Sequence, residues 1–268
     1  MRRGTYQAES LESRVLLSTA VSGYTFENGA YLGQGISSTV VNAKGDLFGV
    51  VQPLTIGQFS GIFEVAAGPT TVIPLVPFNS PAEGTPGGLA LDSQGNLFGI
   101  AGGAPSGAIA YAFELTAKRI AADISKLKTL ATFSGPSGAT VGNVTLDSHD
   151  DLYGVITNLG ANGGVGNVFE IVAGSGQVTT LLSLGNGSEI PSSSLAADAR
   201  GDVFGSLSVV DSSQNLTGEG SLFEITGPSI AKGSPTLSTV VSYTGADGQT
   251  ISNLVMDASG NLYGTTSS

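Results

Sequence analysis

Short apolar runs, separated by turns rich in Gly, Asp and Asn, make up most of this chain. Within the runs, apolar residues recur at every second position, as Phe169 and Ile171 do on either side of Glu170. A period of two residues is typical of a strand with one buried face. No segment shows a sustained helical period, and only the stretch 117–128 has the composition for a helical turn. The pattern therefore predicts an all-β protein.

Three sequence elements return in a fixed order along the chain. The first ends in an aliphatic residue, an aromatic residue and Gly, and its copies end at Gly49, Gly99, Gly154, Gly205 and Gly264. The second contains Phe, Glu and an aliphatic residue, and occupies Ile62–Val65, Ala112–Leu115, Val168–Ile171 and Leu222–Ile225. The third, in which Thr and Val are frequent, occupies Thr71–Phe78, Lys128–Phe133, Val178–Leu184 and Ser238–Tyr243. The copies recur roughly every 50 to 60 residues, which indicates a tandem repeat.

Each repeat predicts four short strands, which we call a, b, c and d. Strand a is the apolar stretch before a turn whose first residue is Asp, or Asn42 in the first repeat. We expect this Asp to accept hydrogen bonds from backbone amides two or three residues on, while Gly takes a positive φ. Strand b carries the aromatic residue, strand c the Phe-Glu pair and strand d the third element. Four strands in roughly 50 residues predict a β-propeller of about five blades, the last incomplete or closed by the N-terminal strand.

The propeller is expected to span residues 19–268 and to leave residues 1–18 as a disordered tail. We place the repeats at approximately 38–80, 88–134, 143–184 and 194–243, with a partial repeat at 252–268 that has strands a and b alone. Two interpretations of this partial repeat are open. Either Gly23–Phe26, which is similar to strand d, pairs with the last hairpin, or the sequence is a piece of a longer propeller. We favour a five-bladed, imperfectly closed ring.

Composition removes several classes of protein. The 268 residues include 40 Gly, no Cys and one His, which excludes disulfide frameworks, thiolate metal sites and multi-His metal centres. The net charge of -11 opposes phosphate backbones, so we expect no nucleic-acid partner. No apolar run reaches the roughly 18 residues of a membrane-spanning helix. We expect a monomer.

Two segments resemble known families. Asp257–Thr266 and Val168–Ile171 resemble the GloVer tandem repeats of bacterial exported proteins, and the resemblance covers roughly residues 23–268. It departs from the family pattern at Asn42 and Asp150. Leu11–Leu17 is similar to the LEPR-XLL region of large exported or surface proteins found notably in planctomycetes, with Ser13 in place of the family's Pro. These resemblances imply an extracellular or cell-surface protein. They imply no defined activity, and no apolar signal segment follows Arg2-Arg3.

The turn of the third repeat is the candidate metal site. Asp147, Asp150 and Asp151 lie within five residues, together with His149. Carboxylates are preferred ligands of calcium, which is the one cofactor that the sequence suggests. The spacing is not that of an EF-hand loop. The other interpretation is a purely structural turn, as we expect for the equivalent Asp residues, Asp92, Asp198 and Asp257.

Two further sets of acidic residues recur through the repeats. For the strand c residues we expect structural partners, because they should lie away from the axis; they are Glu64, Glu114, Glu170 and Glu224. The connections from strand d to the next strand a should gather four acids near one rim. These form a candidate ligand face of Glu27, Glu83, Glu189 and Asp247, which attracts cations weakly or is simply solvated.

These observations lead to one expected function and two alternatives. We expect a non-enzymatic, exported or surface propeller for binding, adhesion or scaffolding, with a surface glycan or a protein as partner. One alternative is a propeller enzyme acting on polysaccharide, a lyase or glycosidase, which would need paired carboxylates at the axial mouth. The other is a calcium-stabilised structural propeller.

Overall fold

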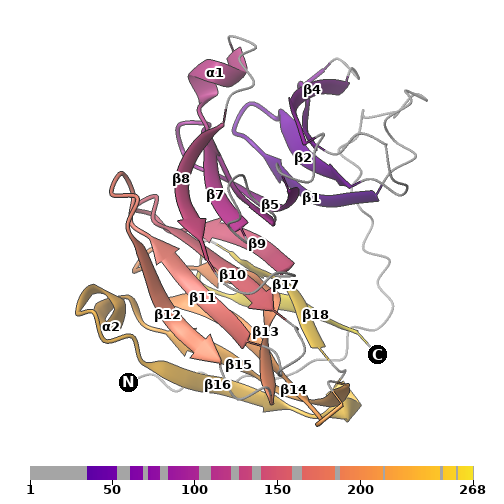
Figure 1. The fold of residues 1–268 in the computed structure, drawn as a ribbon, viewed down its shortest axis with the longest axis vertical. Helices are drawn as coiled ribbons and strands as arrows, with labels where there is room; N and C mark the ends of the chain where they lie inside the picture. The colour runs from indigo at the N-terminus through magenta and orange to yellow at the C-terminus, as the bar shows by residue number, and fades with distance from the viewer. Residues whose placement is uncertain are drawn as a thin grey trace.

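The computed structural model describes residues 35–52, 61–68, 72–78, 84–102, 110–121, 127–134, 140–158, 165–184, 188–213, 215–247, 250–257 and 259–267. Within these ranges the chain forms four four-stranded sheets and one two-stranded sheet, all antiparallel and arranged in sequence order (Figure 1). This is the arrangement of a β-propeller of about five blades, and it confirms the predicted fold class. The proposed closing strand, Gly23–Phe26, lies outside the described residues.

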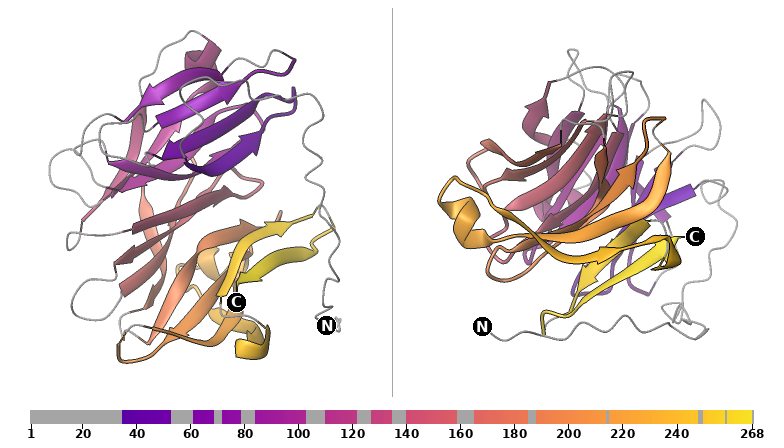
Figure 2. Two further views of the ribbon diagram at one scale, coloured as in Figure 1. Left: turned by 90° about the vertical axis from the view of Figure 1, so that its right-hand side faces the viewer. Right: turned by 90° about the horizontal axis from the view of Figure 1, so that it is seen from below.

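The strands of each sheet pair in the order in which they occur in the chain. The first sheet comprises β1 (Gly35–Val41), β2 (Leu47–Gln52), β3 (Gly61–Val65) and β4 (Val72–Pro77). The second comprises β5 (Thr85–Leu91), β6 (Leu97–Gly102), β7 (Ala110–Leu115) and β8 (Lys128–Phe133). The third comprises β9 (Thr140–Leu146), β10 (Leu152–Asn158), β11 (Val165–Ile171) and β12 (Val178–Leu184). The fourth comprises β13 (Glu189–Ala197), β14 (Val203–Val210), β15 (Leu216–Ile225) and β16 (Leu237–Tyr243). The fifth is the hairpin of β17 (Thr250–Met256) and β18 (Leu262–Ser267), which lies beside the fourth sheet (Figure 2).

Two short helices follow strand c in the second and fourth sheets. The helix α1 (Ala117–Ala121) lies inside the stretch 117–128 where a helical turn was predicted. The equivalent helix α2 (Gly227–Ala231) was not predicted, because five residues are too few to show a helical period. A 3-10 turn, Gly245–Asp247, follows β16. No helix in the described part of the chain is long and apolar enough to cross a membrane.

The predicted turn between strands a and b is present in every sheet. In the second sheet, Asp92 Oδ1 accepts the amides of Gln94 and Asn96, at 2.9 and 2.8 Å. The same bonds from residues two and four positions on occur in the other turns, whose first residues are Asn42, Asp147, Asp198 and Asp257. The expectation of bonds two or three residues on is thus corrected to two and four. The intervening Gly95 has φ +85°, a conformation that Gly adopts without strain.

The fifth residue of this turn ties strand b to the end of strand c. Asn96 Oδ1 accepts the amide of Ala117 at 2.9 Å, and Asp151 Oδ1 accepts that of Ala173 at 2.7 Å. Asp46 and Asp202 accept the amides of Ala67 and Gly227 in the same way. The side chain at this position therefore fixes where strand c ends.

A Phe ring of strand c covers the Gly of strand b in each four-stranded sheet. Gly49 pairs with Phe63, and a Cβ atom built on Gly49 would lie 2.5 Å from Phe63 Cζ. The other three pairs, equally tight, are Gly99 with Phe113, Gly154 with Phe169 and Gly205 with Phe223. All four rings are buried. Each Gly is therefore required because it has no side chain, and not because of the wider range of backbone conformations that Gly can adopt.

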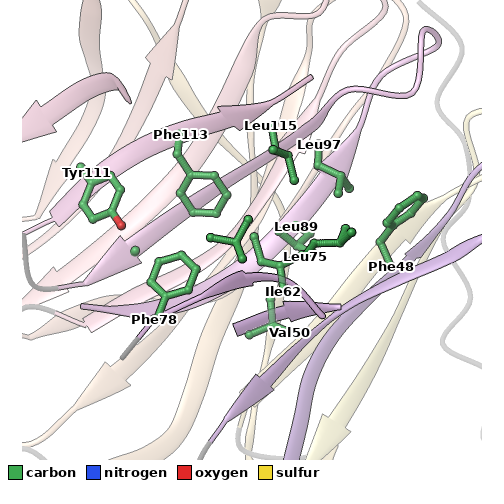
Figure 3. Packing of buried hydrophobic residues seen from close by; sticks show 12 residues of the cluster. Phe48, Val50, Ile62, Leu75, Phe78, Leu89, Leu97, Tyr111, Phe113 and Leu115 are labelled. Atoms are coloured by element: carbon green, nitrogen blue, oxygen red, sulfur yellow. The ribbon is translucent and has the colours of Figure 1, made fainter. Parts of the chain in front are cut away.

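Adjacent sheets pack face to face through apolar side chains. Figure 3 shows the cluster between the first two sheets, where Phe78 faces Tyr111 and Phe113. The ring centroids of Phe78 and Phe113 lie 6.1 Å apart in a tilted arrangement that aromatic pairs favour. Full burial of one such side chain stabilises the fold by about 1.5–3 kcal/mol. The core is thus distributed between neighbouring blades.

Adding a methyl group under a Phe ring should destabilise the protein. We expect Gly99→Ala to lower the free energy of unfolding by about 1–3 kcal/mol, because the new Cβ overlaps the ring of Phe113. In the Gly99→Ala/Phe113→Leu double variant the overlap is relieved, so the two losses should be less than additive. Urea denaturation of Gly99→Ala, Phe113→Leu and the double variant measures this coupling. Strictly additive losses would contradict the proposed Gly–Phe contact.

Candidate functional site

A bulge interrupts the first strand of every sheet at about the same position. The register against strand b shifts between Ile36 and Ser38 in β1 and between Pro86 and Leu89 in β5. The same irregularity occurs in β9, β13 and β17. The residue four positions before the first residue of each turn lies within this irregularity or next to it, a set consisting of Ser38, Gly88, Asn143, Ser194 and Asn253. A bulge re-aims side chains, and at Asn253 the backbone reaches φ +53°.

The five bulged strands line a cavity of about 560 Å³. The polar residues of its lining are Ser37, Ser38, Thr39, Asn143, Thr145, Ser194 and Asn253. The rest of the lining is aliphatic: Ile36, Val40, Leu89, Ala90, Leu91, Val144, Leu146, Leu195, Leu254 and Val255. Since one strand from each blade contributes, we call this the axial cavity. None of its lining residues has an ionisable side chain.

Several of the lining residues also hold neighbouring blades together. Ser38 Oγ accepts the amide of Leu89 at 3.2 Å, and the buried Ser194 Oγ accepts that of Leu254 at 3.0 Å. Between the second and third blades, a Cβ on Gly88 would overlap the side chain of Asn143. The axial cavity thus has walls that are fixed from blade to blade.

The carboxylates of the candidate metal turn point to different partners. Asp147 Oδ1 caps the turn through the amides of His149 and Asp151, while Asp151 Oδ1 accepts the amide of Ala173. Asp150 takes the place of the usual Gly, with φ 63°, and lines a second cavity of about 420 Å³ between the second and third blades. In the described part of the chain, no group of three or more His, Asp or Glu side chains could hold a metal ion. Calcium binding at this turn stays an untested prediction, and the geometry gives the carboxylates a structural role.

Asp147 also belongs to a buried polar cluster with Tyr153 and Glu170. The Tyr153 hydroxyl lies 3.4 Å from Asp147 Oδ2 and 3.3 Å from Glu170 Oε1, and it can donate to either. The turn of the next blade covers the cluster, since a Cβ on Gly201 would lie 3.3 Å from Asp147 Oδ2. Burial raises the pKa of Glu170, which the hydrogen bond from Tyr153 partly offsets. Burial and the neighbouring carboxylates raise the pKa of Tyr153 as well.

Two of the other strand c acids have structural partners of the expected kind. Glu114 Oε2 pairs with Lys128 Nζ at 2.8 Å, and Glu224 Oε2 lies 3.4 Å from Ser238 Oγ. For Glu64, burial is the main cause that raises the pKa, with a smaller contribution from Asp46. His149, at the apex of its turn, is exposed, and its Nδ1 lies 3.4 Å from Asp147 Oδ2.

The predicted ligand face is only partly described. Glu189 begins β13, where it pairs with Val209, and Asp247 ends the 3-10 turn after β16. Glu27 and Glu83 lie outside the described residues. Sequence reasoning did not single out the axial residues. The signal was present as a column of Ser, Gly and Asn four positions before each turn.

The buried carboxylate of Glu170 should make stability depend on pH. Its pKa is raised on folding, so the folded state binds the proton more tightly than the unfolded chain. Stability should therefore fall as the pH rises from 4.5 through the folded pKa. Glu170→Gln keeps an acceptor for Tyr153 and removes the charge, so we expect it to stabilise the protein at pH about 7 and to have little effect at pH about 4.

Urea denaturation at the two pH values tests this expectation. Glu114→Gln is the matched control, because it removes an equivalent carboxylate that pairs with Lys128 and should bring no gain at neutral pH. An equal effect of Glu170→Gln at both pH values would contradict the assigned cause.

Comparisons with known proteins identify the fold alone. No protein-family model and no curated protein sequence matches the chain. A prolyl endopeptidase structure is similar with a TM-score of 0.54 and 12% identity, over 84% of this chain and 31% of that protein. A puromycin-hydrolyzing peptidase of Mycobacterium tuberculosis is similar with a TM-score of 0.50 and 10% identity, over 77% of this chain and 29% of that one. A protein of unknown function from Bacteroides caccae has a TM-score of 0.49 and 13% identity, with 87% and 71% coverage. The chain thus spans under a third of the length of the two peptidases, and what it shares with them is the β-propeller fold.

Proposed function

We propose that this chain is a non-enzymatic binding propeller that takes a neutral, hydroxyl-rich ligand, a surface glycan, in the axial cavity. The observation that carries the proposal is the lining of this cavity. Hydroxyl and amide groups can both donate and accept hydrogen bonds, as the hydroxyl groups of a sugar require. The volume of about 560 Å³ lies within the range of small-ligand sites.

The aliphatic part of the lining suits the same ligand class. Sugars present C–H faces beside their hydroxyl groups, and the exposed side chains of Ile36 and Val255 provide apolar surface in the lining. A charged ligand would leave its charge without an opposite partner among these residues, at a high cost in desolvation. The lining therefore favours neutral sugars over acidic ones.

The chemistry of the lining supports binding rather than hydrolysis. Glycoside hydrolysis commonly uses two carboxyl groups on either side of the scissile bond. The residues that line the axial cavity have no carboxyl group. The acids that recur in each blade instead bond to turns, strand ends and neighbouring side chains.

An exported or cell-surface location completes the proposal. It rests on the resemblance of the blades to GloVer repeats and of Leu11–Leu17 to the LEPR-XLL region. The acidic character, with a pI near 4.3, is compatible with that setting. There, a propeller with a sugar-binding cavity would serve adhesion to a glycan.

Blocking the axial cavity should weaken glycan binding. We expect an array of neutral glycans to identify a ligand for the wild-type protein, and Thr39→Trp to weaken its binding at least about tenfold, because the indole fills the cavity. Thr180→Trp is the matched control, since Thr180 is exposed on the outer strand β12 and should leave the affinity unchanged. Titration calorimetry of the three proteins measures the effect. Equal affinities would refute the axial site, and release of shorter glycans during incubation, detected by mass spectrometry, would refute a purely binding role.

The location is tested separately by fractionation of cells that produce the protein. Immunoblots should detect it in the surface or extracellular fraction. A purely cytosolic protein would contradict the proposed export without affecting the binding experiment.

A further inference from the structure

The Glu residue of strand c has a polar partner in three of the four-stranded blades. In the second blade, Glu114 Oε2 pairs with the ammonium group of Lys128 at 2.8 Å. The corresponding Glu residues of the third and fourth blades lie 3.3 and 3.4 Å from the hydroxyl groups of Tyr153 and Ser238. Glu64 of the first blade has no hydrogen-bond or ion-pair partner among the residues that the structure describes.

Apolar residues stand at both positions from which a partner comes in the other blades. On strand b, Phe48 has the place of Tyr153, so the hydroxyl group is missing. On strand d, Ile73 lies opposite Glu64, at the position that Lys128 has in the second blade. Burial raises the pKa of Glu64, which reflects the cost of a charge that no partner offsets. A cationic ligand would offset this cost.

Glu64 lines a cavity of about 490 Å³ between the first and second blades. The volume lies within the range of small-ligand sites. Val41 is 52% exposed, and Leu91 and Ile120 are partly exposed, so the cavity also offers apolar surface. Its described lining shares only Leu91 with that of the axial cavity. The two cavities are therefore separate sites.

The other acids of the described lining are engaged within the protein. Asp46 Oδ1 accepts the amide of Ala67 at 2.9 Å, and Asp92 caps the turn of the second blade. Their charges still act on the cavity, against the single ammonium group of the exposed Lys44. The lining therefore attracts cations, and Glu64 is its one carboxylate that is free to bond to one.

A single free carboxylate suits an ammonium group better than a metal ion. Calcium takes roughly six to eight oxygen ligands. In the described part of the chain, no group of three or more His, Asp or Glu side chains could hold a metal ion. A primary ammonium group has three N–H donors, and one carboxylate offsets its charge. The pair of Lys128 and Glu114 shows this bond at the equivalent place in the second blade.

We propose that the cavity between the first two blades binds an aliphatic amine, whose ammonium group pairs with Glu64 and whose hydrocarbon chain lies against the apolar part of the lining. The ammonium group takes the place that Lys128 has relative to Glu114 in the second blade. A free alkylamine and the side chain of lysine both provide this chemistry. The site goes beyond the proposed glycan binding and does not depend on it, because the axial cavity has its own lining.

An NMR titration of the isotope-labelled chain with n-pentylammonium chloride at neutral pH and low salt tests the proposal. Saturable shifts of the backbone amide signals of Lys44 and Glu64 are expected. n-Pentanol keeps the hydrocarbon chain and lacks the charge, so it should bind at least about tenfold more weakly. Nα-acetyl-lysine methylamide is the second amine probe. Binding of either amine at Glu64 supports the proposal, and the tighter of the two identifies the source of the amine.

Removal of the carboxylate locates the binding. Glu64→Gln should weaken the binding of n-pentylammonium at least about tenfold, because the ammonium group loses its ionic partner. Glu224→Gln is the matched control, since it removes the same charge from the equivalent position of the fourth blade. This control should bind like the wild type.

A second variant fills the site with an ammonium group of the chain itself. Ile73→Lys places Lys opposite Glu64, as Lys128 is placed opposite Glu114, and should weaken amine binding to a similar extent. Ile73 is 39% exposed, so we expect the fold to be retained, which circular dichroism checks. Thr180→Lys adds the same charge at an exposed position of β12 and should leave the affinity unchanged.

Four results would overturn the proposal. Two of them are the absence of saturable shifts in the wild-type protein and equal binding by the Glu64→Gln variant. The third is an affinity for n-pentanol that equals the affinity for n-pentylammonium. The fourth is binding that appears only in a Lys44→Gln variant, which would show that Lys44 itself pairs with Glu64. The glycan array reports on the axial cavity, so its outcome is independent of all four.

Discussion

The contact of a Phe ring with a bare Gly backbone on the neighbouring strand determines how each blade is assembled. In four sheets the ring occupies the space that any larger residue at the Gly position would need. Because side chains alternate along a strand, placing the Phe on the Gly also sets the register of the whole strand pair. The aromatic residue then lies opposite Glu, and the preceding aliphatic residue opposite Val, Leu or Ile. The same rings form part of the apolar packing that joins one blade to the next.

The turn between strands a and b adds a polar constraint to this apolar one. Its first side chain caps the turn, and its fifth side chain bonds to the backbone where strand c ends. Most of the recurring acids of the chain therefore bond to backbone amides or neighbouring side chains. Free carboxylates often indicate a reactive site, but these carboxylates are engaged within the structure. The neutral axial cavity is the complementary result, since the bulged strands bring Ser, Thr and Asn to the centre and leave the acids in the turns and on the middle strands.

Residue by residue, the sequence predicted the blades better than the site. The tandem motifs indicated four strands per repeat, because each motif encodes local chemistry: an Asx turn, a Gly with positive φ and a strand of period two. Sequence analysis missed α2, which has only five residues and so shows no helical period. It also missed four residues of the axial cavity, Ser38, Asn143, Ser194 and Asn253. Each repeat contains one of them at most, and a single Ser or Asn carries no signal in the sequence. Only the bulge in each first strand and the convergence of the five strands turn them into one surface.

What the amino-acid sequence determined by itself was the unit: its four strands, the capped turn and the pairing of Phe with Gly. These depend on neighbours along the chain or on the adjacent strand, and their chemistry can be seen in a single repeat. Tertiary structure decided what the units build together, namely a neutral cavity at their centre and the covering of the Tyr153–Glu170 cluster by the turn of the next blade. These features depend on contacts between residues of different blades or on the place of a blade in the arc, which no single repeat contains.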